Sequence, residues 1–175
     1  MITVIDNFFS DKLFQAVHDE IRNCDFISLR EKGLNANLED AGDIDYPGLR
    51  TVALTTHNPI LDTMIIQHID NQRMSFTNRG YKYNQYAHLR LESDNQDDFI
   101  HTDNTDWAYL IYISKTNLDS GTKFYTEDDK EHTHIGFVQN RAVFFDCHIR
   151  HMAFNNHGTD MNDGRLTING FCEYI

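Results

Sequence analysis

From residue 73 onward the sequence consists of short runs rich in aromatic and branched residues, separated by polar turns, with no long pattern of helical period. Such runs are typical of β-strands, and turns at this spacing predict a sandwich or jelly roll. The expected strands are 73–77, 81–92, 100–103, 108–114, 122–125, 134–139, 142–145 and 166–174. A mainly β fold is therefore the first expectation.

The first half of the chain carries two patterns of helical period. Ser10 is a suitable N-cap, and the apolar residues after it share one helical face, which predicts a helix ending near Cys24. Asn58 followed by Pro59 is a second start signal and predicts a helix to about Gln72. We also expect short strands at 2–5 and 50–55 and a loop over 30–48. These flanking helices suit support on one outer face of the β fold.

Length and composition limit the class of protein. A chain of 175 residues, 40% of them hydrophobic, fits one folded domain over 1–175. It has no apolar run of about 18 residues and no basic segment leading into one at the N-terminus, so we expect neither a membrane span nor secretion. Three cysteines, an odd count, favour a reduced, cytoplasmic protein. A formal net charge of −12 disfavours a nucleic-acid partner.

The tripeptide His-x-Asp occurs twice, in different surroundings. His68 and Asp70 fall in an apolar pattern of helical period, where residues two apart point to nearly opposite sides. His101 and Asp103 precede the aromatic and branched run 107–113, which is typical of a strand. Residues two apart in a strand share a face. Only the second tripeptide therefore has the geometry to bind one metal ion.

Two imidazoles and one carboxylate on one face of an octahedral metal form the ligand set of non-haem Fe(II) oxygenases. A second histidine would thus complete the set. His148 and His151 both follow the apolar run 142–145. They are three positions apart, so in an extended segment they point to opposite faces and only one can be the ligand.

The order of these elements resembles the 2-oxoglutarate/Fe(II)-dependent dioxygenases, and among them small members similar to prolyl 4-hydroxylases. The segment 145–151 is similar to the one that precedes the distal histidine in that family, which aligns His151 with the ligand. Arg165, 14 residues later, then falls on the basic residue that binds the keto acid. The turn at 120–122 reads Ser-Gly-Thr where the family usually has Gly-Gly-Thr. The resemblance covers 1–24 weakly and 99–172 well.

The resemblance implies a double-stranded β-helix (jelly roll) with N-terminal supporting helices. It implies Fe(II) held by His101, Asp103 and His151, 2-oxoglutarate as the co-substrate paired with Arg165, and ascorbate as a candidate stimulant. The expected reaction is hydroxylation of a peptide side chain, an amino acid or a small metabolite. Halogenating relatives carry a small residue where this chain has Asp103, so the carboxylate favours hydroxylation.

A further polar side chain commonly assists at the far end of the keto-acid pocket in this family. The candidates are Tyr83, Tyr86, His88, Arg90, Tyr112 and Thr122. We select Tyr112 and Thr122 as cofactor-binding residues. Arg50 and Trp107 are candidate substrate contacts, and Cys147 is expected to be a small core residue because no base is arranged beside it.

Two rival interpretations stay open. One is a cupin-like metal enzyme that uses His132 and His134 without a keto acid. These histidines follow the acidic stretch 127–131 and lack the glycine frame of the cupin motif, so we expect a solvated hairpin there. The other rival is a non-catalytic jelly-roll binding module. Metal binding and keto-acid turnover separate all three interpretations.

Overall fold

The computed structural model describes residues 1–28, 47–73 and 81–175. Its helices are α1 (Asp11–Arg22), α2 (Leu54–His57), α3 (Pro59–Arg73) and the short 3-10 helix η1 (Glu92–Asp97). The strands are β1 (Ile2–Ile5), β2 (Ile27–Ser28), β3 (Leu49–Arg50), β4 (Tyr81–Arg90), β5 (Trp107–Tyr112), β6 (Asn117–Tyr125), β7 (Glu131–Phe137), β8 (Ala142–Asp146), β9 (His151–Phe154) and β10 (Arg165–Tyr174).

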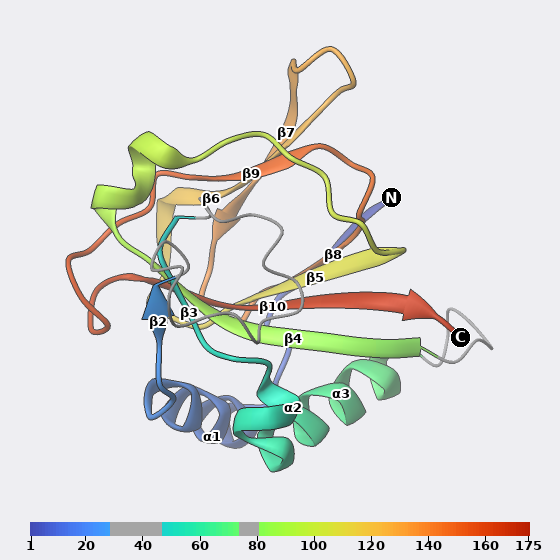
Figure 1. Ribbon diagram of the computed structural model, residues 1–175, viewed down its shortest axis with the longest axis vertical. Helices are drawn as coiled ribbons and strands as arrows, with labels where there is room; N and C mark the ends of the chain where they lie inside the picture. The colour runs from blue at the N-terminus through green and yellow to red at the C-terminus, as the bar shows by residue number, and fades with distance from the viewer. Residues whose placement is uncertain (29–46, 74–80) are drawn as a thin grey trace.

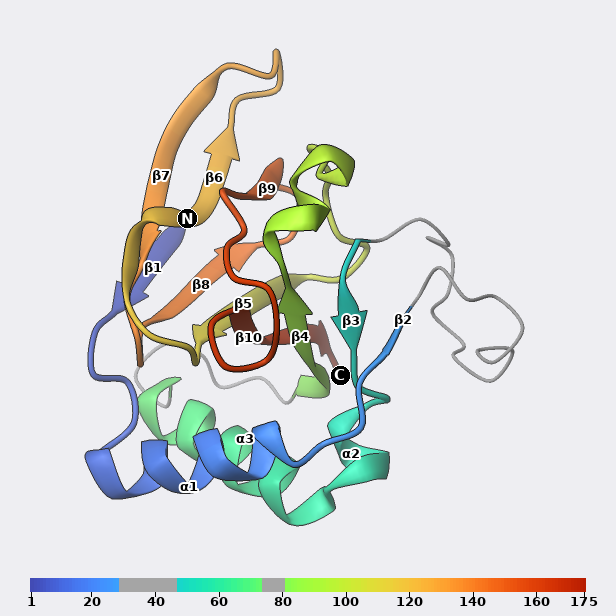
Figure 2. The ribbon, with the colours of Figure 1, turned by 90° about the vertical axis from the view of Figure 1, so that its left-hand side faces the viewer.

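The strands form two antiparallel sheets. The large sheet has seven strands in the order β1-β8-β5-β10-β4-β3-β2, and the small sheet has three in the order β7-β6-β9. The three α-helices lie along one face of the large sheet, and the small sheet lies on the opposite side (Figures 1 and 2). This confirms the predicted jelly roll, with supporting helices on one outer face.

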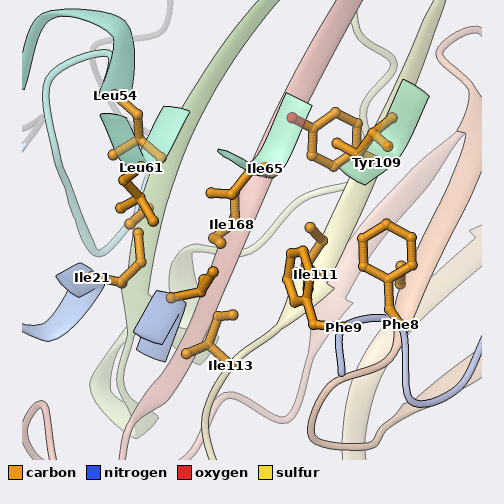
Figure 3. Close-up of a cluster of buried hydrophobic side chains, with 14 of the residues drawn as sticks. Phe8, Phe9, Ile21, Leu54, Leu61, Ile65, Tyr109, Ile111, Ile113 and Ile168 are labelled. Carbon is orange, nitrogen blue, oxygen red and sulfur yellow. The ribbon is translucent and has the colours of Figure 1, made fainter. Parts of the chain in front are cut away.

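Alternation along the strands divides the interior into two cores. On β5, Trp107, Tyr109 and Ile111 belong to the core beneath the helices, whereas Leu110 and Tyr112 belong to the core between the sheets. Figure 3 shows the helix-side core, to which all three α-helices contribute buried side chains. Each fully buried large apolar side chain contributes about 1.5–3 kcal/mol. The inner face of the large sheet is thereby left to line the space between the two sheets.

Both helix-start signals lie at helix N-termini. Asn58 caps α3, since its Oδ1 accepts a hydrogen bond of 3.1 Å from the backbone N–H of Leu61. Ser10 occupies the N-cap position of α1 with an extended backbone, and its carbonyl accepts the N–H of Phe14 at 2.8 Å. The side chain of Ser10 makes no capping hydrogen bond. The packing of Val17 and Ile21 into the core therefore stabilises α1 more than its cap does.

Asn140 ties the N-terminal segment to the turn between β7 and β8. Its backbone φ is 60°, in the left-handed region. Its side-chain amide accepts a hydrogen bond of 2.9 Å from the N–H of Phe9 and donates one of 2.8 Å to the carbonyl of Phe9. Asn tolerates this backbone conformation better than most residues. Asn140 can therefore occupy the turn while its side chain pairs with the buried backbone of Phe9.

Several predicted boundaries were wrong. The expected strand at 50–55 ends at Arg50 as β3, and α2 begins at Leu54, which is fully buried against the helix-side core. Burial of one leucine outweighs the strand preference of its neighbours here. The expected strand 122–125 is longer in the structure, because β6 begins at Asn117 and contains a register irregularity between Asn117 and Gly121.

Other differences concern the region of the predicted ligands. The segment 100–103 forms only one isolated bridge, between His101 and His151, and not a strand. Strand β9 was not expected, because four residues give too short a pattern to detect. Of the strand predicted at 73–77, residue 73 ends α3, and residues 74–77 lie outside the described residues, as do residues 30–46 of the predicted loop. Among the described helices, none has the length and apolar character needed to cross a membrane.

Candidate functional site

The three predicted metal ligands lie together although they come from two separate segments. His101 and Asp103 follow η1, and His151 begins β9. One ligand atom from each of the three lies within 4.8 Å of the others. Backbone hydrogen bonds set this spacing: His101 and His151 exchange N–H and carbonyl groups at 3.0 and 2.9 Å, and the N–H of Asp103 donates to the carbonyl of Cys147 at 3.0 Å.

Each histidine of the cluster is oriented by a carbonyl two residues before it. Nδ1 of His101 lies 3.1 Å from the carbonyl of Phe99, and Nδ1 of His151 lies 2.9 Å from that of Ile149. A ring nitrogen facing a carbonyl carries the proton, which leaves Nε2 as the lone-pair donor. Nε2 of His151 lies 3.4 Å from Oδ2 of Asp103. The orientation therefore suits two Nε2 donors and one carboxylate around a common point.

Burial keeps both imidazoles neutral. It lowers the pKa of His101 and of His151 to about 4, and the mutual proximity of the rings adds to the effect at His101. Burial also raises the pKa of Asp103. Neutral imidazole is the form that binds a metal ion, and a divalent ion would stabilise the carboxylate that burial disfavours. The donor set thus fits the two-histidine, one-carboxylate arrangement of Fe(II) sites.

The alternative histidines lie elsewhere. The side chain of His148 is 79% exposed, with Nδ1 3.0 Å from Oδ1 of Asp146. On α3, Nε2 of His68 contacts the carbonyl of Phe8 at 2.7 Å. His132 and His134 are exposed on β7 and lie outside the cluster. The described residues therefore give no support to a cupin-like site at that pair.

Arg165 begins β10 and is buried, at 3% exposure. Its Nη2 donates to the carbonyl of Gly121 at 3.3 Å and to Oγ1 of Thr122 at 3.4 Å. The hydroxyl of Tyr112 donates to the same Thr122 oxygen at 2.9 Å. The structure thus brings together the three residues that we selected for the keto acid. Their guanidinium and hydroxyl groups can together bind one carboxylate.

Position 121 on β6 has no room for any residue other than glycine. Its φ is +157°, and an added Cβ would lie 2.1 Å from the carbonyl oxygen of Ile135 on the neighbouring strand. Only glycine allows β6 and β7 to approach this closely. The carbonyl of Gly121 is thereby placed where Arg165 can donate to it.

Polar side chains continue along the inner face of β10 beyond Arg165. Thr167 is paired in register with His88 on one side and with Tyr112 on the other. Its hydroxyl donates to Oδ1 of Asn169 at 2.7 Å, and Nδ2 of Asn169 lies 3.4 Å from Nδ1 of His88. Burial, together with the charges of neighbouring arginines, lowers the pKa of His88 well below its usual value. His88 is therefore neutral in this polar row.

The other candidates have different environments. Arg90 forms a buried ion pair with Asp98, and each side chain is 4% exposed. The guanidinium of Arg50 lies 4.2 Å from the ring centroid of Tyr86, on the inner face.

Three more candidates pack elsewhere. Tyr83 donates to Asp70, and Trp107 packs against aromatic rings of the helix-side core. Cys147 is buried beside Oγ1 of Thr105, and burial raises the pKa of its thiol to about 12, as expected for an inert core residue.

Sequence reasoning missed three residues near the site. Asp98 pairs with Arg90, Asn156 donates to Asp98, and His157 lies against Phe137. All three are in irregular segments, where no periodicity signals which way a side chain points. By contrast, polar Arg165, Thr167 and Asn169 alternate with apolar Leu166 and Ile168. Such alternation in a strand indicates that the polar side chains share one face.

The fold of this chain is similar to the folds of several solved structures. HygX from Streptomyces hygroscopicus, solved with nickel, 2-oxoglutarate and hygromycin B bound, gives a TM-score of 0.68 at 10% identity, covering 98% of this chain and 82% of that chain. A Pseudomonas putida prolyl-4-hydroxylase gives 0.67 at 14% identity, with 98% and 91% covered. A Burkholderia pseudomallei oxidoreductase of the 2OG-Fe(II) oxygenase family gives 0.69 at 8% identity, with 98% and 84% covered.

No family model and no curated protein matches the sequence. At identities of 8–14%, the likeness rests on the path of the backbone across nearly the whole chain. The chain therefore has the fold of the 2-oxoglutarate/Fe(II) oxygenases.

Proposed function

We propose that this protein is an Fe(II)- and 2-oxoglutarate-dependent dioxygenase that hydroxylates its substrate. The observation that carries the proposal is the convergence of His101, Asp103 and His151 in a fold where Arg165 is buried at the start of β10. Structures of this fold include a member of the 2OG-Fe(II) oxygenase family and HygX, which was solved with nickel and 2-oxoglutarate bound. The ligand set and the carboxylate-binding arginine together support both cofactors.

Each residue of the site has a separate task. His101 and His151 provide neutral Nε2 donors, and Asp103 provides the one anionic ligand. Arg165 pairs with the distal carboxylate of the keto acid, while the hydroxyls of Thr122 and Tyr112 hold the guanidinium end of the pocket. Bound Fe(II) would supply the centre at which dioxygen is reduced as 2-oxoglutarate is converted to succinate and carbon dioxide.

Asp103 also bears on the type of reaction. A carboxylate at this position fills the coordination site that a halide would need, so hydroxylation is favoured over halogenation. A peptide side chain, an amino acid and a small metabolite remain the substrate classes proposed. The three cysteines are free thiols, which supports a reducing compartment such as the cytoplasm.

The test is succinate formation from 2-oxoglutarate with Fe(II) and ascorbate, alongside calorimetric binding of Mn(II) under anaerobic conditions. We expect wild type to bind one Mn(II) and to form succinate, and His151→Ala to do neither. His148→Ala is the matched control, because this exposed histidine lies three positions away, and it should behave as wild type.

Other outcomes separate the rivals. Equal succinate formation by His151→Ala and wild type would exclude this ligand assignment. Metal binding with turnover that needs no keto acid would favour a cupin-like enzyme. A wild-type protein that neither binds the metal nor turns over the keto acid would favour a non-catalytic binding module.

A further inference from the structure

The segment between β9 and β10 is held in place by specific hydrogen bonds. The backbone of Asn156 pairs with the side-chain amide of Asn95, at 2.7 and 2.8 Å. The carbonyl of Gly158 accepts the N–H of Glu92 at 3.0 Å. Gly158 has a φ of +79°, and an added Cβ would lie 2.3 Å from the backbone of Asp163. The residue between Asn156 and Gly158 therefore has a fixed position.

That residue, His157, lies near Arg165, and both contact Phe137. Its ring meets the ring of Phe137 edge to face, with centroids 5.7 Å apart at 82°. The guanidinium carbon of Arg165 lies 5.5 Å from the centroid of the same phenylalanine ring. An imidazole and a guanidinium thus border one aromatic side chain, beside the Thr122 hydroxyl that also contacts Arg165.

Nδ1 of His157 is buried and has no hydrogen-bond partner among the described residues. A buried polar atom left without a partner costs on the order of a lost hydrogen bond. Burial and the positive charge of Arg165 lower the pKa of His157, and the backbone carbonyl of Asn155 and the charge of Asp163 oppose this shift only in part. The charged groups that act on the ring are Arg165 on β10 and Asp163 in its own segment. The ring is therefore neutral beside a cation, and Nδ1 makes no hydrogen bond of normal geometry among the described residues.

We propose that His157 is a positioning residue for the co-substrate, and that it hydrogen-bonds the carboxylate that Arg165 binds. The inference rests on the proposed function, since it assigns a second contact to the distal carboxylate of 2-oxoglutarate. A carboxylate between the two side chains gives the ring an acceptor and replaces repulsion by attraction. The pKa of His157 then rises on binding, and the imidazole takes up a proton from solvent.

Two keto acids separate this contact from metal chelation. 2-Oxoglutarate and pyruvate share the keto-acid end, but pyruvate has no distal carboxylate. Binding of each to the Mn(II)-loaded protein is measured by anaerobic calorimetry. We expect His157→Gln to bind 2-oxoglutarate about tenfold more weakly, the usual scale for a lost hydrogen bond to a charged group. Its affinity for pyruvate should equal that of wild type, as should that of the exposed control His148→Gln for both ligands.

Proton uptake provides a readout that a purely structural role would not change. Calorimetry near pH 7 in buffers of different ionisation enthalpy should show wild type taking up a fraction of a proton with 2-oxoglutarate and none with pyruvate. His157→Asn keeps an N–H donor near the position of Nδ1. It should therefore recover most of the affinity while losing the proton uptake.

The failures are distinguishable. If wild type does not bind 2-oxoglutarate, the proposed function fails and this inference fails with it. If wild type binds it and Arg165→Met abolishes binding, but His157→Gln binds as wild type, only the role of His157 is overturned. Equal losses for 2-oxoglutarate and pyruvate, or absence of proton uptake in wild type, also overturn it.

Discussion

Arg165 is buried, and its Nη2 donates to the carbonyl of Gly121 at 3.3 Å and to Oγ1 of Thr122 at 3.4 Å. A charge-assisted bidentate pair in such a place contributes on the order of 2–4 kcal/mol. We expect Arg165→Met to raise the apparent KM for 2-oxoglutarate about 30-fold or more, with Mn(II) affinity unchanged. Arg150→Met, which removes a partly exposed arginine paired with Asp129, is the control. Unaltered co-substrate affinity in Arg165→Met would contradict the assignment.

Asp103 is the one anionic group of the ligand cluster. Its removal takes away charge as well as a donor atom, so Asp103→Ala should weaken Mn(II) binding by at least about 100-fold. Asp103→Glu should recover little, because one added methylene moves the carboxylate by about 1.5 Å. The measurement is anaerobic calorimetry, with exposed Asp146→Ala as the control. Wild-type affinity in Asp103→Ala would show that another group binds the metal.

At the level of single elements, the turn before β8 offers a separable test of stability. Asn140→Gly removes two buried hydrogen bonds but accepts the positive φ, and should cost about 2 kcal/mol. Asn140→Ala adds backbone strain and should cost about 3 kcal/mol. The free energies of unfolding come from urea titrations of metal-free protein.

A matched pair of variants isolates the strain in that comparison. Asn7 is exposed with a φ of 50°, so Asn7→Ala and Asn7→Gly differ mainly in the cost of this backbone conformation. The difference in free energy of unfolding between the Ala and Gly variants should be similar at positions 7 and 140. A larger stability for Asn140→Ala than for Asn140→Gly would show that the left-handed backbone is not costly there.

Elements with a strong local signal could be predicted from the sequence. α1 and α3 have apolar faces and starting residues, and β5, β8 and β10 are rich in branched and aromatic residues. α2 could not be predicted, because four residues carry no helical period and the burial of Leu54 decides the conformation. β9 was missed for the same reason of length.

The site shows the same division between local pattern and tertiary contact. His101 and Asp103 were selected because residues two apart in a strand share a face, although 100–103 forms only an isolated bridge. Resemblance supplied His151 and Arg165. The position of His157 could not be predicted, because it depends on contacts of an irregular segment with η1 and with Phe137. The pairing of Asp98 with Arg90 likewise arises only when two distant backbones meet.

For the molecule as a whole, buried histidines make stability depend on pH. The pKa of His88 lies well below its usual 6.5 in the folded state. Below about pH 6.5 the unfolded chain therefore binds a proton that the folded protein does not, so the free energy of unfolding falls as pH decreases. One full proton corresponds to about 1.4 kcal/mol per pH unit. Between pH 5 and about 6.5, His88→Asn should reduce the slope of the free energy of unfolding against pH by up to this amount.

The measurement is urea unfolding of metal-free protein at several pH values. His101, His151 and His157 also have lowered pKa values and act in the same direction, so wild type should retain a slope after the His88 change. Exposed His148→Asn is the control and should leave the slope as it is. Identical slopes for wild type and His88→Asn would contradict the burial of a neutral imidazole at this position.

The strand order also governs how a nascent chain can reach this fold. β10 is the last strand in sequence, yet it lies between β5 and β4 near the middle of the large sheet (Figure 1). Among the described strands, β10 hydrogen-bonds to both β5 and β4 and so links the two halves of that sheet. Synthesis from Arg90 to Arg165 takes roughly 4–15 s at usual ribosomal rates. During that interval the edge of β4, and that of β5 once it is made, can pair with strands of other chains. A chaperone that binds these two strands before β10 is made would prevent such pairing.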